Sequence, residues 1–240
     1  RNLWLWNCFN EGCQTEYENQ KELFDNVYQG RPQGNKTVQE FKGKPRKKRK
    51  MEWPGDMWMF TDMLTKEPTH KALEYVRDRM YDPEKLAKHF NVGYCGFSRM
   101  SNAHDRIIAP VYLNGKFEGW QARLIGDPAS KEIPKWWTSP GMRRSSVLYN
   151  YDNAIKHHTK VIVEGPGDVW GFGLSVVGIF GKAMTRDQIQ LLADASKEDT
   201  AVVILLDPDQ ASDEKQKGKI HHIEKLYHQL SDVSKFRGKV

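Results

Sequence analysis

The sequence predicts an α/β protein, α+β overall, in which a parallel sheet follows a smaller helical and antiparallel-sheet subdomain. After Lys160, three short and continuously apolar runs alternate with helical stretches, which is typical of buried parallel strands. Before Lys160, an Asn-Gly pair joins two strand-like segments, which indicates a hairpin. Hydrophobic residues make up 38% and charged residues 28% of the 240 residues, so the chain can bury a sizeable core.

The chain is predicted to fall into four parts. A small module covers residues 1–40, and a basic linker covers residues 41–52, where the run Lys42–Lys50 repels itself too strongly to pack. A helical and antiparallel part follows over residues 53–158, and a parallel-sheet part over residues 159–240. The linker is either a solvated tether or a tether that also touches phosphates, and a nuclear address is the weaker third alternative.

Charge and cysteine usage narrow the class of partner and the compartment. The formal net charge of +6 favours an anionic partner, with nucleic acid the first expectation. No window approaches the ~20 apolar residues of a membrane helix, and the start carries no signal-peptide pattern. Only three cysteines occur, which suits a reducing compartment. We therefore expect a soluble, cytoplasmic protein without a membrane partner.

The helical and antiparallel part begins with a pair of helices. Apolar residues recur at helical spacing over residues 68–90, with Pro83 at the start of the second helix. Two strands are then expected at Arg106–Leu113 and Lys116–Leu124, joined by the Asn-Gly turn. These strands predict a small antiparallel sheet.

In the parallel-sheet part, predicted strands alternate with predicted helices. The predicted strands are Val161–Val163, Val176–Phe180 and Ala201–Leu206. The predicted helices are Gly167–Gly173, Thr185–Ala195 and Lys215–Leu230. No internal repeat is visible.

Two of these buried strands end in acidic residues. Glu164 follows the first, and Asp207 and Asp209 follow the third, so the carboxyl ends of neighbouring strands should bring them together. Clustered carboxylates suit Mg or Mn, which take one or two carboxylates, waters and substrate phosphates. Asp168 is expected as an outer ligand or proton acceptor. The alternative is that Glu164 and Asp168 only cap a helix and that Asp-Pro-Asp is an ordinary turn.

These acidic segments also carry a family resemblance. The stretches Val163–Val169, Gly178–Gly181 and Leu206–Ala211 resemble the Toprim domain of bacterial DnaG-type primases. Earlier blocks resemble the rest of a DnaG polymerase core and occur in the family's order, over roughly residues 70 to 230. They include Asp105–Pro110, Gly119–Arg123, Pro134–Pro140 and Leu148–Asn150.

The resemblance implies a groove for template and nucleotide. The residues that it places there are Arg79, Arg106, Arg123 and Lys135. Trp136 offers a stacking face beside them, and Lys182, directly after Gly181 at a strand end, could hold a triphosphate. Guanidinium groups grip phosphates bidentately and indole rings stack on bases, so these residue types suit the role. The alternative is that the tryptophans Trp136 and Trp137 belong to the core, that the arginines are solvated strand ends, and that Lys182 is a plain loop lysine.

The first module resembles the second half of the zinc ribbon that precedes such cores. Cys8 and Cys13 would supply two of the four ligands that a structural zinc site normally takes. They are separated by four residues, whereas the family usually has two, so two plain cysteines remain an alternative. Cys95 is expected to be a buried small residue. A further acidic element that the family carries after the last Toprim helix is not found before Val240.

The resemblance implies a DNA primase, a nucleotidyltransferase that copies single-stranded DNA into short RNA primers during replication. Its partners would be the template, ribonucleoside triphosphates and a replicative helicase in a primosome, and a phage origin is preferred, so that the cytoplasm is bacterial or that of a phage-infected host. A Toprim nuclease and a non-catalytic single-stranded DNA-binding Toprim protein remain alternatives. A topoisomerase is disfavoured because it would need a nucleophilic tyrosine in a further domain.

Overall fold

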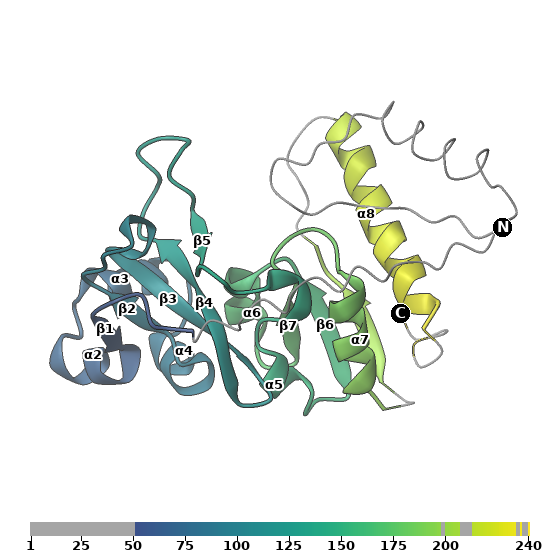
Figure 1. The fold of residues 1–240 in the computed structure, drawn as a ribbon, viewed down its shortest axis with the longest axis horizontal. Coiled ribbons are helices and arrows are strands. Elements are labelled where there is room, and N and C mark those ends of the chain that lie inside the picture. The colour runs from purple at the N-terminus through teal and green to yellow at the C-terminus, as the bar shows by residue number, and fades with distance from the viewer. Residues whose placement is uncertain (1–50, 198–199, 207–212, 234–235, 237–239) are drawn as a thin grey trace, which may run out of the picture. The chain divides into compact units, whose positions relative to one another are not determined.

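The computed structural model describes residues 51–197, 200–206 and 213–233, together with Phe236 and Val240. These residues fold around a five-stranded antiparallel sheet and a three-stranded parallel sheet (Figure 1). The mixed α/β class predicted from the sequence is therefore confirmed. The predicted module over residues 1–40 and most of the linker over 41–52 lie outside the described residues, so the division into domains stays a prediction.

The antiparallel sheet has its strands in sequence order. They are β1 (Met57–Met59), β2 (Gly93–Cys95), β3 (Arg106–Leu113), β4 (Lys116–Leu124) and β5 (Trp136–Thr138). The two long strands have the predicted bounds, and Asn114 (φ 53°) and Gly115 (φ 73°) form the predicted turn between them. Positive φ at both positions matches the right-handed twist of the hairpin, which explains the Asn-Gly pair.

Three helices accompany this sheet: α2 (Phe60–Lys66), α3 (Lys71–Asp78) and α4 (Pro83–Phe90). The sequence predicted α3 and α4 but not α2. Helix α4 begins where Asp82 Oδ1 accepts hydrogen bonds from the backbone N–H groups of Glu84 and Lys85, with Pro83 in the first turn. It ends at Asn91, which has a left-handed conformation.

The hairpin strands are buried on both faces, which explains why they are so apolar. Ile107, Ala109 and Val111 belong to the core formed with the three helices. Ile108 and Trp120 belong to a smaller cluster on the opposite face. There the indole N–H of Trp120 donates to the backbone oxygen of Glu52 at 2.9 Å, so the segment that leads into β1 covers this face.

The parallel sheet has the order β7-β6-β8. Its strands are β6 (Thr159–Val163), β7 (Val176–Gly178) and β8 (Ala201–Ile204), and β6 pairs in parallel with both neighbours. The three predicted apolar runs are confirmed as strands, although β7 ends before Phe180. Phe180 has φ 60°, which turns the chain out of the strand.

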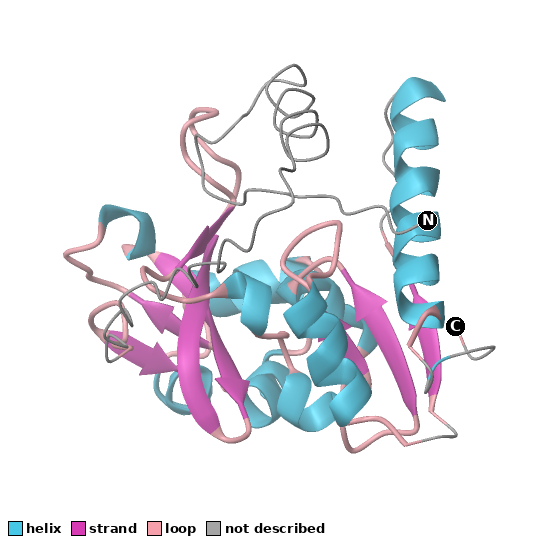
Figure 2. Ribbon diagram, turned by 45° about the vertical axis from the view of Figure 1, so that its right-hand side comes forward, coloured by secondary structure: helices cyan, strands magenta, loops and turns pink. Residues whose placement is uncertain are grey.

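Helices lie on both faces of the parallel sheet (Figure 2). They are α6 (Pro166–Phe172), α7 (Arg186–Asp194) and α8 (Asp213–Ser231), with the short α5 (Tyr151–Ala154) before β6. Ile162 packs with α7 and the end of α8, whereas its neighbour Val163 packs with α6 and the antiparallel half. This alternation gives the central strand two buried faces, as its sequence predicted.

Tyr149 connects the two halves of the core. Its backbone pairs with Gly178 of β7, its hydroxyl accepts a hydrogen bond from the indole N–H of Trp170 at 2.8 Å, and its ring stacks on Phe90 of α4. The side chain is 1% exposed, and burial raises the pKa of its hydroxyl. Among the residues described, no helix is long and apolar enough to cross a bilayer.

Candidate active site

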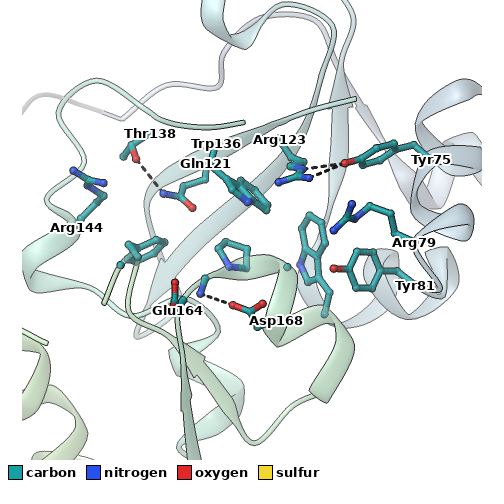
Figure 3. Close-up of a pocket in the computed structure, with 16 residues that line it drawn as sticks. Tyr75, Arg79, Tyr81, Gln121, Arg123, Trp136, Thr138, Arg144, Glu164 and Asp168 are labelled. Carbon is teal, nitrogen blue, oxygen red and sulfur yellow. Dashed lines mark hydrogen bonds between the residues drawn. The ribbon is translucent and has the colours of Figure 1, made fainter. Parts of the chain in front are cut away.

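A cavity of about 390 Å³ lies between the two sheets. One wall comes from the end of β6 and from α6, and the opposite wall comes from α3, β4 and β5 (Figure 3). Five of the residues predicted for the site line it: Arg79, Arg123, Trp136, Glu164 and Asp168. Residues far apart in the sequence therefore meet around one space.

The acidic wall is built at the junction of β6 and α6. Glu164 follows the last residue of β6, its Oε1 is shielded from solvent, and the side chain as a whole is half-buried. Asp168 Oδ2 accepts a hydrogen bond from the backbone N–H of Gly165 at 2.9 Å. Asp168 thus caps the start of α6, as the helix-capping alternative predicted, and it also faces the cavity.

Backbone contacts with the segment that follows β7 fix the main chain of this junction. The backbone N–H of Gly181 donates to the backbone oxygen of Glu164 at 3.1 Å. Gly178 of β7 lies so close to Gly165 that a Cβ at position 178 would stand 3.1 Å from the carbonyl carbon of Gly165. Phe180, which lines the cavity, takes a left-handed conformation that is strained for a bulky side chain.

Asp207 and Asp209 lie outside the described residues, so their place in the site stays a prediction. The strand that precedes them is described. β8 pairs Ile204 with Ile162 of β6, and the backbone N–H of Leu205 donates to the oxygen of Ile162 at 2.9 Å. The chain therefore leaves β8 at the same edge of the sheet where Glu164 stands.

The basic wall is organised by tyrosine. Nε and Nη2 of Arg123 donate to the hydroxyl of Tyr75 at 3.0 and 2.9 Å. The Arg79 guanidinium lies 5.8 Å from the centroid of the Tyr75 ring. Burial disfavours the charge of Arg79, but the hydroxyl oxygens of Tyr75 and Tyr81 outweigh it, so the pKa of Arg79 lies above its ordinary value. Within the described ranges, no carboxylate forms an ion pair with either arginine.

Aromatic rings continue this wall toward α6. The Arg123 guanidinium lies 5.4 Å from the ring centroid of Trp136, and the ring centroids of Trp136 and Trp170 are 5.6 Å apart. Tyr81 meets Trp170 edge-on at 5.7 Å. Trp137 lies on the other face of the sheet, where its ring centroid is 5.5 Å from that of Trp120 and it packs, partly buried, against the smaller cluster.

Three predicted residues are placed away from the cavity lining. Arg106 is 2% exposed, and its Nη1 donates to the backbone oxygen of Pro134 at 2.7 Å. Burial, and then the charge of Arg123, lower its pKa. Lys135 Nζ lies 3.4 Å from Asp127 Oδ1 at the surface, and Lys182 is exposed. Their roles in binding stay predictions, and the contacts of Arg106 are those of a structural residue.

The cavity also contains residues that sequence reasoning missed: Tyr75, Tyr81, Gln121, Thr138, Arg144 and Trp170. Gln121 Nε2 donates to Thr138 Oγ1 at 3.1 Å. Gln121 stands two positions before Arg123 on β4, and side chains two apart on a strand share a face. That alternation was the signal that could have found Gln121. Arg144, in the short 3-10 helix Arg144–Ser146, carried no comparable signal.

The described carboxylates fit a magnesium or manganese ion as a partial site. Glu164 and Asp168 offer hard oxygen atoms to one cavity, and such ions need only one or two carboxylates beside waters and phosphates. Among the described residues, no group of three or more His, Cys, Asp or Glu is gathered for a metal. Cys8 and Cys13 lie outside them. Cys95 is buried as predicted, and burial, followed by the nearby Asp56, raises its pKa to about 11.

The fold is similar to that of solved DNA primases. A crystal structure of Aquifex aeolicus primase, with its zinc-binding and RNA polymerase domains, matches with a TM-score of 0.53 and 21% identity over 72% of this chain and 49% of that one. A DNA primase domain from Pseudomonas aeruginosa gives a TM-score of 0.49 and 18% identity over 65% and 60% of the two chains. A DnaG primase catalytic domain bound to single-stranded DNA gives 0.48 and 17% over 70% and 76%.

The likeness to the Aquifex aeolicus structure shows the class of fold. The described residues adopt a fold similar to that of the Aquifex aeolicus primase, and in this chain an antiparallel-sheet half precedes a parallel-sheet half. The resemblance to primases that the sequence indicated is confirmed at the level of fold by the Aquifex aeolicus structure. The chain spans about half the length of the Aquifex aeolicus chain. No protein-family model and no curated protein sequence matches it.

Proposed function

We propose that this chain is a DNA primase that copies single-stranded DNA into short RNA primers in a metal-dependent reaction. The observation that carries the proposal is the cavity, in which Glu164 and Asp168 face Arg79 and Arg123 within a primase-core fold. A nucleoside triphosphate with a bound cation presents both charges, so it fits a space that has an acidic and a basic wall. The reaction joins the 3′-oxygen of one nucleotide to the α-phosphorus of the next and releases pyrophosphate.

The basic wall binds the phosphates. Arg123 donates from Nε and Nη2 to the Tyr75 hydroxyl, which fixes the plane of its guanidinium before a substrate arrives. A planar guanidinium can still donate to phosphate oxygens from its remaining N–H groups. Trp136, beside it, offers an indole face to a base of the template or of the nucleotide.

The acidic wall would hold the metal ion. Glu164 would be its ligand among the described residues, with Asp168 as an outer ligand or proton acceptor and with Asp207 and Asp209 as the further ligands. When bound, Mg or Mn neutralises the charge that develops on the transferring phosphate. Asp168 also fixes the turn that carries Glu164, because it bonds the backbone N–H of Gly165.

The partners expected for such an enzyme are a nucleic-acid template, nucleotide substrates and a helicase. Single-stranded DNA is the template, ribonucleoside triphosphates are the substrates, and a replicative helicase of the primosome delivers the template. Zinc would bind the first module through Cys8 and Cys13 with ligands from elsewhere. The site of action would be the bacterial or phage-infected cytoplasm. The formal net charge of +6 supports a nucleic-acid partner.

Product analysis tests the proposal. The protein is incubated with single-stranded DNA of varied sequence, labelled ribonucleotides and Mg or Mn, beside the double variant Glu164→Gln, Asp207→Asn. Short oligoribonucleotides from the parent alone are expected. The control is Glu67→Gln, which changes an exposed carboxylate outside the cavity and should keep full activity.

Two other results would each point to another function. Shortened DNA without synthesis would identify a Toprim nuclease. DNA that is bound equally by parent and double variant, and never copied or cut in either metal, would identify a non-catalytic binding protein.

A further inference from the structure

We propose that Gln121, oriented by Thr138, accepts a hydrogen bond from an uncharged donor group of the nucleotide and so determines which nucleotide is used. The inference rests on the proposed function and deepens it. The donor is either the ribose 2′-hydroxyl or an amino group of the base, because both are neutral hydrogen-bond donors.

The sheet face that lines the cavity carries four side chains in two rows. The register of β4 and β5 pairs Arg123 with Trp136 and Gln121 with Thr138. All four line the cavity. The first row is cationic and aromatic, and the second row is neutral and polar. The rows are two residues apart, which is about 6.6 Å along a strand.

This order matches the order of groups in a nucleotide. A phosphate held by Arg123 leaves its sugar and base within reach of groups one row away. Gln121 and Thr138 carry no charge, so they would recognise a hydroxyl or an amino group better than a further phosphate. Arg144 also lines the cavity (Figure 3).

The amide of Gln121 has hydrogen-bonding capacity that the described residues leave open. Its Nε2 donates to Thr138 Oγ1 at 3.1 Å, which turns Oε1 away from Thr138 (Figure 3). No group in the described part of the chain donates to Oε1. The side chain as a whole is only 5% exposed, but Oε1 itself is not sealed off, because it reaches the space of the cavity that the side chain lines. A ligand in the cavity can supply the missing donor.

A site built to hydrogen-bond a substrate group rejects an analogue that lacks it. Gln121→Met keeps the length of the side chain and removes the acceptor. Thr138→Val removes the group that orients the amide, whereas Thr138→Ser keeps the hydroxyl and serves as the matched control. Thermal unfolding of each variant shows whether the fold is retained.

The first measurement is equilibrium binding of nucleoside triphosphates, which needs no catalysis and therefore stands even if the protein is not a primase. Parent affinities are measured for ATP against dATP, and for GTP against inosine triphosphate, which lacks the base amino group. In one of the two pairs, Gln121→Met and Thr138→Val should each lower the affinity for the preferred nucleotide about three- to tenfold. Thr138→Ser should leave that affinity unchanged.

The outcome also identifies the donor. If only the affinity ratio of ATP to dATP falls, Oε1 accepts from the ribose hydroxyl. If only the affinity ratio of GTP to inosine triphosphate falls, Oε1 accepts from the amino group of the base. Where primers are made, the same ratios of kcat/KM should follow the binding ratios. Ratios that stay as in the parent for folded Gln121→Met, or an equal loss for every nucleotide, would overturn the proposal.

Discussion

The two halves of the molecule contribute to the cavity in different ways. The antiparallel half presents side chains from the middle of its strands, such as Gln121 and Arg123 on β4. The parallel half presents groups from the place where a strand ends and a helix begins, at Glu164 and Asp168. The first wall is cationic and aromatic, and the second is anionic. Charges of opposite sign are thus carried by elements that can be altered separately.

Substrate binding and chemistry should therefore be separable by mutation. Arg123 is held by Tyr75 and Trp136 of its own half, and Glu164 is held by main-chain contacts of its own half. A change on one wall should therefore leave the other wall in place.

The largest effect is expected at the acidic wall. Glu164→Gln keeps the size of the side chain but removes the charge that would hold a divalent cation, so primer synthesis should fall by roughly 100-fold or more. Binding of single-stranded DNA should stay within about twofold, because the basic wall is intact. Primer assays and fluorescence anisotropy on the same preparation check both values. Loss of DNA binding would break the separation of the walls.

The next effect concerns the basic wall. Arg123→Lys keeps the charge but loses the fork that donates twice to Tyr75, so nucleotide affinity should fall by about tenfold. The change should appear in KM more than in kcat. Arg99→Lys, an exposed arginine outside the cavity, is the matched control. A selective loss of kcat with unchanged KM would show that Arg123 acts in chemistry and not in binding.

A smaller effect is expected from the hydrogen bonds that Asp105 accepts within the antiparallel half. Asp105 accepts hydrogen bonds from Tyr94 and, at 2.6 Å, from Lys71. Burial works against the Asp105 charge, but these bonds outweigh it, so its pKa lies below the ordinary 3.8. Asp105→Asn should lower the free energy of unfolding at neutral pH by roughly 1 kcal/mol, a modest value because the ion pair is partly exposed.

The contribution of Asp105 to the free energy of unfolding should fall as the pH falls. A carboxyl with a lowered pKa in the folded state stabilises the protein above pH 3.8 and loses that effect as pH falls through the folded value. Urea unfolding should therefore show a difference between parent and Asp105→Asn at neutral pH that disappears in acid. Asp127→Asn, whose carboxylate is 92% exposed, should change little at either pH. A difference that persists in acid would contradict the assignment.

The smallest effect is at the turn after α3. Met80 has φ 62° and is 92% exposed, a conformation that is unfavourable for methionine and free for glycine. Met80→Gly should raise the free energy of unfolding by about 0.5 kcal/mol, because relief of strain exceeds the entropic cost of glycine. Asn91→Gly, where asparagine already tolerates φ 51°, should gain less. Destabilisation by Met80→Gly would show that its side chain has an unrecognised contact.

The sequence predicted the elements whose pattern is long or chemically specific. The hairpin was predictable from Asn114-Gly115, and the buried strands were predictable from continuous apolar runs. Strands β1, β2 and β5 were missed because three residues are too few to show a period. Helix α2 was missed because it spans only seven residues.

The site was predictable where it depends on strand ends and not where it depends on register. Glu164 follows from its place after a buried strand. Arg106 and Arg123 carry the same charge, yet β3 and β4 pair Arg106 with Leu124 and Ile107 with Arg123, which puts the two arginines on opposite faces. Tyr75 became visible only when α3 was placed beside that sheet.

The contact between Gly178 and Gly165 has a consequence for how the cavity adapts. Main-chain atoms have no rotamers to exchange, and an added methyl group at position 178 would meet the carbonyl carbon of Gly165 at 3.1 Å. The main chain that carries Glu164 is therefore stiff. Nucleotides of different shape would be accommodated by rotation of side chains around the cavity and not by a shift of this backbone.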